Sequence, residues 1–459
     1  MPKTSHSAAI SPALVLLILL LCSPAVLFGQ SVEHWPQFRG SEARGIADGP
    51  NLPDRWSATE NVAWKTELPG RAWSSPIVWG DRIFLTTAIS SEELESPKKG
   101  LYFGGNRPEP REVEEERGVA CLDLQSGKVL WKQTVHRGEA DTPIHLKNSF
   151  ASETPTTDGE RVYAYFGNLG LYCLDFEGRP VWTKPFEPRA TRNGWGTAAS
   201  PVLYEDRLYI LNDNDDESYL LCLDKRTGKE IWRKVRDEGS NWSTPYIWQN
   251  DLRTEIVTLG TDKVRSYDLE GNLLWWFTGM STITIATPYA DDGLLYVSSG
   301  YVRDPLRPLY AIRPGASGDI TLEPEQTSNE SIVWSNPEAA PYNPTTLLYD
   351  GRIHVLYDRS LTSCYRAKTG EPLYERERLP KGRHFTASPW AYNGKVFFLN
   401  EDGVTFVLRA GDEFELLHTN ELAEDEMCMA TPAIVGDRLL LRTSARVYCI
   451  RQSDSSGTR

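Results

Sequence analysis

The chain has 459 residues, of which 40% are hydrophobic, and its formal net charge is −14. Binding to nucleic acid or to an anionic membrane surface requires basic patches, so this charge balance argues against both classes of partner. A cation or a basic protein partner stays compatible with it.

The first 29 residues predict an export signal. Lys3 precedes an apolar run over 13–21, and small residues follow as far as Gly29. The run is too short to span a bilayer as a mature helix, so we expect cleavage after Gly29. The alternative is a lipoprotein acylated at Cys22, although Leu21 stands where a small residue would be expected. No later segment predicts a transmembrane helix, so the mature chain is expected in the periplasm or cell envelope, or secreted.

Residues 30–60 form an N-terminal extension, which opens on Trp35-Pro36-Gln37-Phe38-Arg39-Gly40 and continues as a Gly- and Pro-rich stretch. Asn61–Thr66 then predicts a single strand that ends in Trp-Lys.

From residue 61 to residue 452 the sequence repeats one unit eight times. Each copy has a small residue followed by Pro, a short strand, and usually a Gly turn, a second strand and a Trp. The third copy shows the whole unit, from Ser200-Pro201 to Ile231-Trp232. A unit made of strands and tight turns cannot bury its own faces, so radial stacking predicts an all-β, eight-bladed β-propeller. The anchor prolines are Pro76, Pro155, Pro201, Pro245, Pro288, Pro344, Pro389 and Pro432.

The last repeat ends at Tyr448-Cys449-Ile450 and lacks a Trp strand of its own. We therefore expect the strand at 61–66 to complete this last blade and close the ring, which removes exposed sheet edges. Residues 453–459 are expected to be a C-terminal tail.

Two insertions interrupt the repeat. The anchors are 43 to 56 residues apart, except for the 79 residues between Pro76 and Pro155. The excess lies at about 89–118, a segment rich in Glu, Lys and Arg, which predicts an exposed and partly disordered loop. A second insertion lies at about 314–330.

Two residue sets recur at fixed positions of the repeat. An aromatic residue closes most copies, and we expect each to pack against a Gly-containing turn of a neighbouring blade. A cysteine recurs in the third strand of five copies, where a small buried hydrophobe fits better than a disulfide. The aromatic residues are Trp64, Trp131, Trp182, Trp232, Trp275, Trp334 and Tyr374; the cysteines are Cys121, Cys173, Cys222, Cys364 and Cys449, with Cys428 outside the pattern.

The motif Ala-x-Asp-x-x-Thr-Gly-x-x-x-Trp has variants at Cys222–Trp232 and Cys121–Trp131. On these residues the chain resembles the pyrroloquinoline quinone (PQQ)-like β-propeller repeat family over about 35–450. This family includes the PQQ-like repeat proteins of planctomycete-type bacteria and the outer membrane assembly factor BamB. The opening Trp35-x-x-Phe38-Arg39 also looks like the start of quinoprotein alcohol dehydrogenases.

The resemblance to quinoprotein dehydrogenases implies a quinone held between a Trp and a disulfide of adjacent cysteines, with a Ca²⁺ ion and an Asp base. This chain has no adjacent cysteines. PQQ with calcium is therefore a possible cofactor but not the favoured one, and we assign no catalytic residue and no metal ligand.

The segments before the anchors are expected to surround the mouth of the central channel. There, polar groups beside aromatic rings could bind a sugar ring, an extended peptide or a cofactor. The alternative is that Gly and Asn build tight turns and the aromatic residues cover the core. The candidates for this site are Trp73, Glu153, Asn193, Trp195, Asn241, Trp242 and His384, and the same segments also contain Tyr342, Phe385 and Met429.

The run 212–217 has alternating acids like a calcium loop, but it lacks the Gly that an EF-hand loop places at its sixth position. Because a hairpin turn is due there, an acidic turn exposed to solvent is the favoured interpretation and a weak Ca²⁺ site the alternative.

The favoured function is a non-catalytic binding or scaffold module of the cell envelope, which presents its rim loops to a protein or carbohydrate partner. The first alternative is a PQQ-dependent dehydrogenase or PQQ sensor that uses the central channel. A glycan-degrading or glycan-binding propeller is the third reading, and paired carboxylates in the channel would favour it.

Overall fold

The structure is a computed structural model that describes the chain except residues 3–32, 94, 103–111, 381, 423–425 and 454–459. All but the first two residues of the predicted signal at 1–29, the alternative lipid site Cys22 and most of the predicted tail therefore lie outside the described residues. No helix among the described residues is both long enough and apolar enough to cross a membrane.

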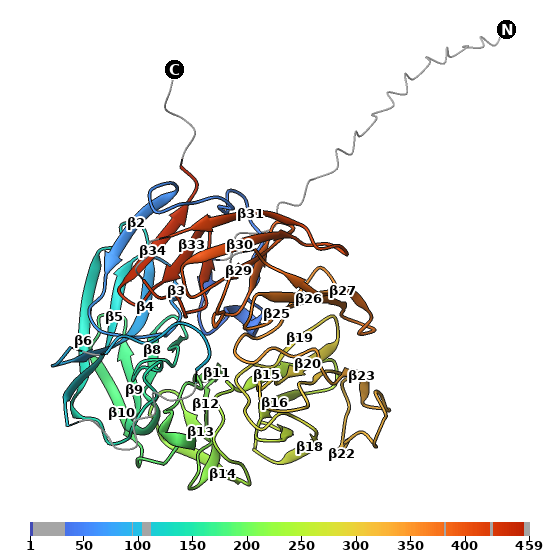
Figure 1. Ribbon diagram of the computed structural model, residues 1–459, viewed down its shortest axis with the longest axis horizontal. Helices are drawn as coiled ribbons and strands as arrows, with labels where there is room; N and C mark the ends of the chain where they lie inside the picture. Colours follow the sequence, from blue (N-terminus) through green and yellow to red (C-terminus); the bar gives the residue numbers. More distant parts are fainter. Residues whose placement is uncertain (3–32, 94, 103–111, 381, 423–425, 454–459) are drawn as a thin grey trace.

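Eight sheets, antiparallel except for one added parallel strand in blade 4, stand around a central axis, which confirms the predicted eight-bladed β-propeller (Figure 1). Blade 1 contains β1 (His34–Trp35), β3 (Ile77–Trp79), β4 (Arg82–Ser90), β5 (Glu114–Asp123) and β6 (Val129–Glu139). Blade 2 contains β7 (Thr156–Thr157), β8 (Arg161–Tyr165), β9 (Gly170–Asp175) and β10 (Pro180–Pro185). Blade 3 contains β11 (Val202–Tyr204), β12 (Arg207–Asn212), β13 (Ser218–Asp224) and β14 (Glu230–Arg236). Blade 4 contains β15 (Tyr246–Gln249), β16 (Thr254–Leu259), β17 (Lys263–Tyr267), β18 (Leu273–Thr278) and β22 (Gly318–Asp319).

The second half of the ring repeats the plan. Blade 5 contains β19 (Tyr289–Asp291), β20 (Leu294–Ser298), β21 (Leu309–Ile312) and β23 (Ile332–Asn336). Blade 6 contains β24 (Leu347–Tyr349), β25 (Arg352–Leu356), β26 (Leu361–Arg366) and β27 (Pro372–Arg378). Blade 7 contains β28 (Trp390–Tyr392), β29 (Lys395–Leu399), β30 (Val404–Arg409) and β31 (Leu416–Glu421). Blade 8 contains β32 (Ala433–Val435), β33 (Arg438–Arg442), β34 (Arg446–Arg451) and β2 (Val62–Glu67). Short 3-10 helices occur at η1 (Ser41–Ala43), η2 (Gly167–Leu169) and η3 (Arg192–Gly194).

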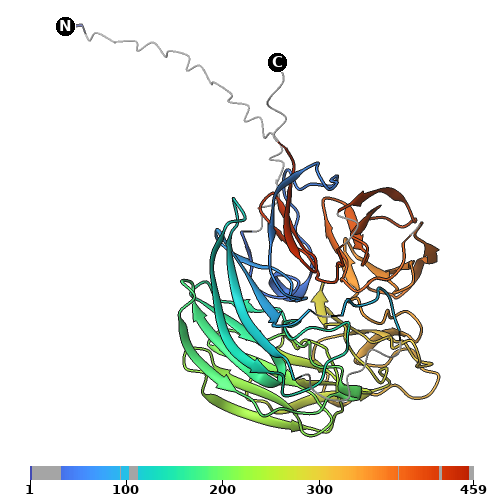
Figure 2. The ribbon, with the colours of Figure 1, turned by 60° about the vertical axis from the view of Figure 1, so that its left-hand side comes forward.

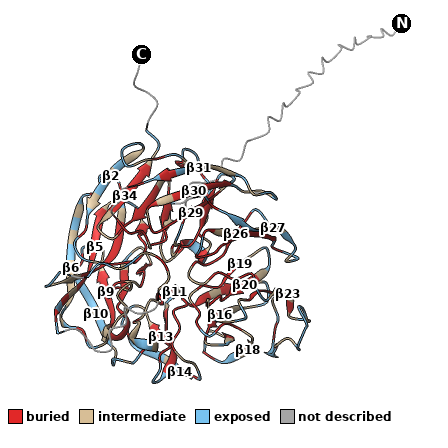
Figure 3. Ribbon diagram, in the orientation of Figure 1, coloured by how far each residue is buried: buried red, intermediate tan, exposed pale blue. Residues whose placement is uncertain are grey.

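Burial falls from the inner strands of a blade to its outer strand. In blade 2, five of the six residues of β9 are buried, whereas β10 alternates between exposed and intermediate positions. Figure 3 shows the same change from buried inner strands to a paler outer edge, and Figure 2 shows the sheets of blades 1 to 3 packed face to face. This gradient is what the repeat requires, because each sheet buries its faces only against the next sheet.

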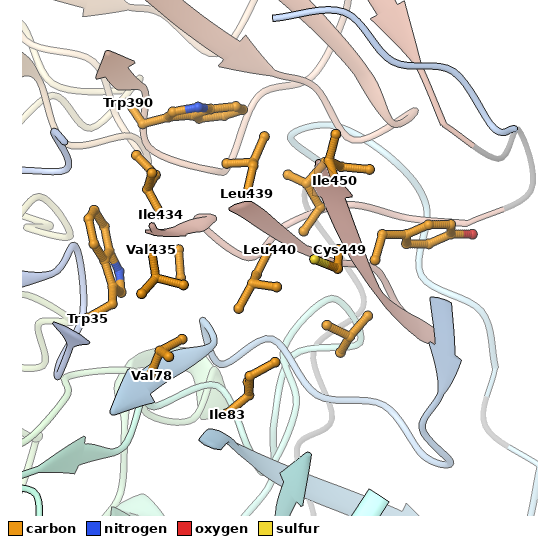
Figure 4. Packing of buried hydrophobic residues seen from close by; sticks show 14 of the residues in the cluster. Trp35, Val78, Ile83, Trp390, Ile434, Val435, Leu439, Leu440, Cys449 and Ile450 are labelled. Atoms are coloured by element: carbon orange, nitrogen blue, oxygen red, sulfur yellow. The ribbon is translucent and has the colours of Figure 1, made fainter. Parts of the chain in front are cut away.

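The ring is closed by its N-terminal strand, as predicted. β2 pairs antiparallel with β34, with Val62 opposite Ile450 and Trp64 opposite Cys449. The largest hydrophobic cluster lies at this junction and joins blades 7, 8 and 1 (Figure 4). β2 comes from the start of the propeller sequence and completes its last blade, so this strand joins the two ends of the ring.

The extension that precedes β2 closes the far end of the central channel. β1 adds to the inner edge of blade 1, with Trp35 opposite Val78. Arg39 is 1% exposed, and its guanidinium donates to the carbonyls of Ala43, Arg44 and Thr346. We call residues 34–48 the plug, because they contact the inner strands of blades 1, 2, 5, 6 and 7 and lie near the centre of the ring (Figure 1).

The aromatic residues dock on glycine turns as predicted at five blade junctions. Gly228, for example, has a φ of +69°, and a Cβ there would lie 2.6 Å from the Trp182 ring. The Trp182 indole also donates to the Lys225 carbonyl. The same arrangement joins Trp64 to Gly127, Trp131 to Gly178, Trp232 to Gly271 and Trp334 to Gly370.

Trp275 departs from this pattern, because its indole donates to Glu255 of its own blade at 2.6 Å. The matching turn of blade 5 is occupied by the second insertion, whose strand β22 pairs in parallel with β18. The insertion therefore replaces the missing glycine contact with a strand.

The first insertion is only partly the exposed loop that the sequence suggested. Its two ends lengthen the hairpin of β4 and β5, with Ser90 opposite Glu115. Farther along, Lys99 pairs with Asp402 of blade 7 at 2.7 Å, and the buried Gly100 N–H donates to Glu401. Residues 99–102 thus reach across the channel mouth from blade 1 to blade 7.

All six cysteines of the described chain are free and buried, as predicted for small hydrophobes. The prediction of a solvent-exposed acidic turn at 212–217 is wrong for its first half. Asn212, Asp213 and Asn214 are buried, and Asp213 forms a fully buried ion pair with Arg236 at 2.9 Å. The arginine comes from β14, so the sequence of the turn itself held no sign of it.

Candidate functional site

The entry segments of blades 2 to 8 converge on one cavity of about 210 Å³ at the open end of the channel. Residues 100–102 of the first insertion form another part of its wall. We call this cavity the mouth pocket. Its lining consists of Gly100, Leu101, Tyr102, His145, Lys147, Asn148, Trp195, Ala198, Trp242, Ile285, Tyr301, Val302, Tyr342, Asn343, Thr386 and Met429.

An arc of rings follows one side of the mouth pocket. Tyr102 lies against His145 with 5.2 Å between ring centroids, and His145 meets Trp195 edge-on at 6.1 Å. Trp195 continues to Trp242 at 5.8 Å. These rings come from three separate entry segments and the insertion, so only the closed ring of blades assembles the arc.

A second pair of rings also lines the mouth pocket. Tyr301 and Tyr342 lie 5.2 Å apart between ring centroids, and both belong to the hydrophobic cluster around Trp242. The backbone N–H of Tyr301 is held by Ser281, and that of Tyr342 by Asp358. The backbone of both residues is therefore anchored before any ligand binds.

The indole of Trp242 is fixed in the same way. Its Nε1 donates to the Gly196 carbonyl at 2.7 Å, and its backbone N–H donates to the Thr284 carbonyl. The loop of η3 is anchored through its backbone, because the N–H of Trp195 donates to the Arg192 carbonyl. Preformed rings of this kind cost little ordering free energy on binding.

The charged pair of the pocket neutralises itself. Lys147 Nζ lies 2.6 Å from Glu401 Oε1, and the Glu401 side chain is fully buried. The same carboxylate accepts from the Gly100 N–H and the Thr386 hydroxyl, each at 2.7 Å. Among the described lining residues, Lys147 alone carries a permanent charge, so the pocket as a whole is close to neutral.

Four polar groups of the lining remain available to a ligand. An ammonium has three donors, and Lys147 uses two of them on Gly100 O and Glu401. Within the described part of the chain, the hydroxyls of Tyr301 and Tyr342 and the side-chain amide of Asn343 have no hydrogen-bond partner. The pocket therefore combines apolar rings with several uncommitted polar groups.

A buried carboxyl supports the Tyr342–Asn343 segment from below. Asp358 accepts the backbone N–H groups of both residues, at 3.1 and 3.2 Å. Burial raises the pKa of Asp358 to about 6, and these two hydrogen bonds oppose that rise. Asp358 is thus a positioning group for the pocket wall.

The sequence-predicted candidates lie in three places: in the pocket lining, on the exposed rim and behind the pocket wall. Trp195 and Trp242 line the mouth pocket, together with Tyr342 and Met429. Asn193 is exposed on the rim in η3, with a φ of +54°.

The remaining candidates stand behind the pocket wall. Trp73 is buried and its indole donates to the Lys147 carbonyl, so it supports the segment that carries the ammonium. Asn241 is buried and donates to Asp213 in the blade 3 to blade 4 junction. His384 packs over Gly100, and Phe385 is buried against Phe406.

Glu153 is 2% exposed and lies beneath the segment 142–150 rather than in the pocket. It accepts from the Thr197 hydroxyl at 2.5 Å. Burial raises the pKa of Glu153 from 4.5 to about 7, against a smaller opposing effect of that hydrogen bond and of Arg117. It is a buried structural carboxyl that changes charge near neutral pH.

Sequence reasoning missed Tyr102, Tyr301 and Glu401. Tyr301 and Glu401 follow the second strand of their blades, β20 and β29, whereas all the candidates predicted from the sequence precede an anchor proline. A polar or aromatic residue just after the second strand of the repeat, as in Asp213, Asp358 and Glu401, was the available signal.

The mouth pocket does not fit PQQ held with a Ca²⁺ ion. PQQ carries three carboxylates, which require cationic partners, and the ammonium of Lys147 is already compensated by Glu401. Ca²⁺ requires six to eight oxygen ligands, several of them carboxylates. The described residues contain no group of three or more His, Cys, Asp or Glu side chains that could hold a metal ion.

Comparison with known proteins agrees with the fold. Residues 115–275 match the family model described as outer membrane protein assembly factor BamB. The BamB of Burkholderia pseudomallei is 26% identical over 208 residues, which cover 40% of this chain and 50% of that protein. The chain is thus an eight-bladed β-propeller that is similar to PQQ-like repeat propellers over part of its length. A polyvinylalcohol dehydrogenase of a Pseudomonas species is 22% identical over 272 residues, or 52% of this chain and 38% of the dehydrogenase.

Solved structures repeat the architecture at low identity. BamB from Moraxella catarrhalis superposes with a TM-score of 0.50 at 12% identity, over 80% of this chain and 99% of that one. A europium-containing methanol dehydrogenase superposes with a TM-score of 0.56 at 11% identity, over 89% of both chains. At these identities the likeness concerns the fold alone, and the sequence matches span half or less of the two relatives.

Proposed function

We propose that this PQQ-like propeller is a non-catalytic binding module of the cell envelope. It recognises its partner with the mouth pocket and the loops that surround it. The observation that carries the proposal is the convergence of seven entry segments on one preformed, ring-lined and nearly neutral pocket. Such a pocket has the means to hold a ligand, and its charged groups are committed to one another rather than to acid–base chemistry.

The similarity to BamB supports an envelope location and a protein partner on the mouth side. The export signal expected at residues 1–29 supports the same location. The plug occupies the opposite end of the channel, so the mouth side is the end whose inner surface stays accessible.

Site-specific photo-cross-linking in the native host tests this function. A benzoyl-phenylalanine at Asn193 probes the exposed rim of the mouth, and the same probe at Leu252, which is 66% exposed on the hairpin of β15 and β16, serves as the control. We expect a discrete envelope protein to cross-link from position 193 and not from position 252. Equal products from both positions, or none from position 193, would contradict the proposal.

A PQQ-dependent dehydrogenase is the second candidate, because the polyvinylalcohol dehydrogenase match spans about half of this chain. The donor set of the mouth pocket argues against it, as described above. Titration of the purified protein with PQQ, with and without Ca²⁺, decides between the two. Saturable quenching of tryptophan fluorescence at micromolar PQQ would favour the dehydrogenase, and no quenching is the result that we expect.

A further inference from the structure

We infer that the mouth pocket takes one neutral sugar ring, such as the end of a glycan, and this inference rests on the proposed function. The chemistry of the lining selects the class of ligand in three steps: charge, shape and polar groups.

The charge of the pocket disfavours ionic ligands. Lys147 is 11% exposed and its charge is balanced by Glu401, whose side chain is fully buried. A ligand carboxylate would compete with Glu401 for the same ammonium and would leave a buried carboxylate without its partner, which is costly. A ligand cation would be repelled by the ammonium of Lys147, and the nearest carboxylate, Glu401, is already paired with that ammonium. A neutral ligand meets neither penalty.

The rings of the pocket favour a flat ligand with C–H faces. Trp195 and Trp242 form one pair of adjacent rings in the lining, and Tyr301 and Tyr342 form another. The C–H face of a pyranose packs against such rings, as other flat apolar surfaces do. The cavity of about 210 Å³ is smaller than the roughly 300–1,000 Å³ of pockets for drug-sized ligands, so it suits one ring with the rest of the ligand in solvent.

The uncommitted polar groups distinguish a sugar from an aromatic peptide side chain. The hydroxyls of Tyr301 and Tyr342, the amide of Asn343 and the third N–H of Lys147 all belong to residues of the lining. A pyranose carries hydroxyls around its whole edge and can use several of these groups at once. An aromatic side chain offers one polar atom at most and would leave the others unpaired on burial.

Calorimetric titration of the full mature protein tests the inference. The probes are methyl glycosides and disaccharides of neutral glucose, galactose, mannose and N-acetylglucosamine, with cellotetraose and maltotetraose as longer chains. Glucuronic acid and N-acetyl-tryptophanamide are the anionic and peptide-like comparisons. We expect saturable binding of at least one neutral sugar at millimolar concentration or below, and binding of glucuronic acid that is at least about tenfold weaker.

The tetrasaccharides distinguish a free sugar from a glycan end. Equal affinity for a methyl glycoside and its tetrasaccharide means that the pocket reads one ring only. Higher affinity for the tetrasaccharide means that the rim loops bind further rings. Both results support the inference, whereas binding of N-acetyl-tryptophanamide in the absence of any sugar binding overturns it, as does no binding of any probe.

Conservative variants tie the binding to the pocket. Tyr301→Phe, Tyr342→Phe and Asn343→Ala each remove one polar group, and we expect each to weaken the neutral sugar about 3- to 10-fold. Tyr204→Phe is the matched control, because Tyr204 lines a separate cavity beside the plug. Equal losses in Tyr204→Phe and the pocket variants would place the sugar elsewhere and overturn the inference.

A variant that changes the charge of the pocket tests why neutral ligands are preferred. Glu401→Gln leaves the ammonium of Lys147 uncompensated. We therefore expect the affinity of this variant for glucuronic acid, relative to its affinity for the neutral sugar, to rise by at least about tenfold. An unchanged preference would contradict the argument. If no sugar binds while the cross-link from position 193 persists, this inference falls and the proposed function stands.

Discussion

The two ends of the central channel differ in what covers them. At the far end the chain fills its own channel with the plug, where Trp35 and Arg39 are each 1% exposed. At the mouth end, the rings of Trp195 and Tyr342 face an open cavity. The same ring of inner strands therefore supports stability at one end and leaves apolar surface and polar groups unsatisfied at the other. That difference identifies the mouth as the end available for recognition.

The largest effect is expected from removing the segments that close the ring and the far end. A chain that begins at Leu68 lacks β1, the plug and β2, so blade 8 loses its outer strand and the core of the junction opens. We expect this chain to lose its cooperative thermal transition, as followed by circular dichroism. A truncated chain that melts like the intact protein would show that closure by β2 is dispensable.

A point change in the plug tests the same end with less disruption. Trp35→Ala removes a buried indole from the junction of blades 7, 8 and 1 and is expected to cost about 3–5 kcal/mol of unfolding free energy. Urea denaturation of the variant and the intact protein measures it. A loss below about 1 kcal/mol would mean that the plug rests on the ring without stabilising it.

Glu153 predicts a pH dependence on the mouth side. Its pKa in the folded protein is about 7, above its ordinary value of 4.5, so the folded state holds the proton more tightly than the unfolded state. The unfolding free energy should therefore fall as pH rises from about 4.5 to about 7 and then level off, by on the order of 3 kcal/mol.

Glu153→Gln isolates this contribution from other titrating groups such as Asp358. We expect the variant to match the intact protein near pH 4.5 and to exceed it in stability near pH 8, in denaturation experiments at both values. Parallel pH profiles for the two proteins would show that Glu153 does not titrate in this range.

The smallest effect on stability is expected in the mouth pocket itself. Tyr301→Phe and Asn343→Ala remove groups that have no partner in the described chain, so each should change the unfolding free energy by less than about 0.5 kcal/mol. Thermal melts of both variants beside Trp35→Ala measure the contrast between the two ends. A large loss in either pocket variant would mean that the mouth is part of the stabilising core.

Local repetition made most of the fold predictable. The anchors and the motif at Cys222–Trp232 predicted eight blades, and the lone strand before blade 1 predicted the pairing with β34. Each of these inferences needed only the pattern within one repeat, or the absence of one strand from the last. The plug was not predicted, because a Gly- and Pro-rich extension has no periodicity that shows where it lies.

The site was predictable only in part, for the same reason. Trp195 and Trp242 were found because they stand just before an anchor. The acidic turn at 212–217 was expected in solvent, since nothing in the turn indicates that Arg236 would bury Asp213.

The sequence by itself therefore determined the architecture of this protein: strands, blade number and closure follow from a pattern repeated within short windows. Only the tertiary structure decided the mouth pocket and the plug. Lys147 and Glu401 are 254 positions apart in sequence, and they meet because the closed ring brings blade 7 beside the entry of blade 2. A repeat specifies the contacts that recur in every blade, whereas a binding site is made of side chains that differ between blades and meet only at the axis.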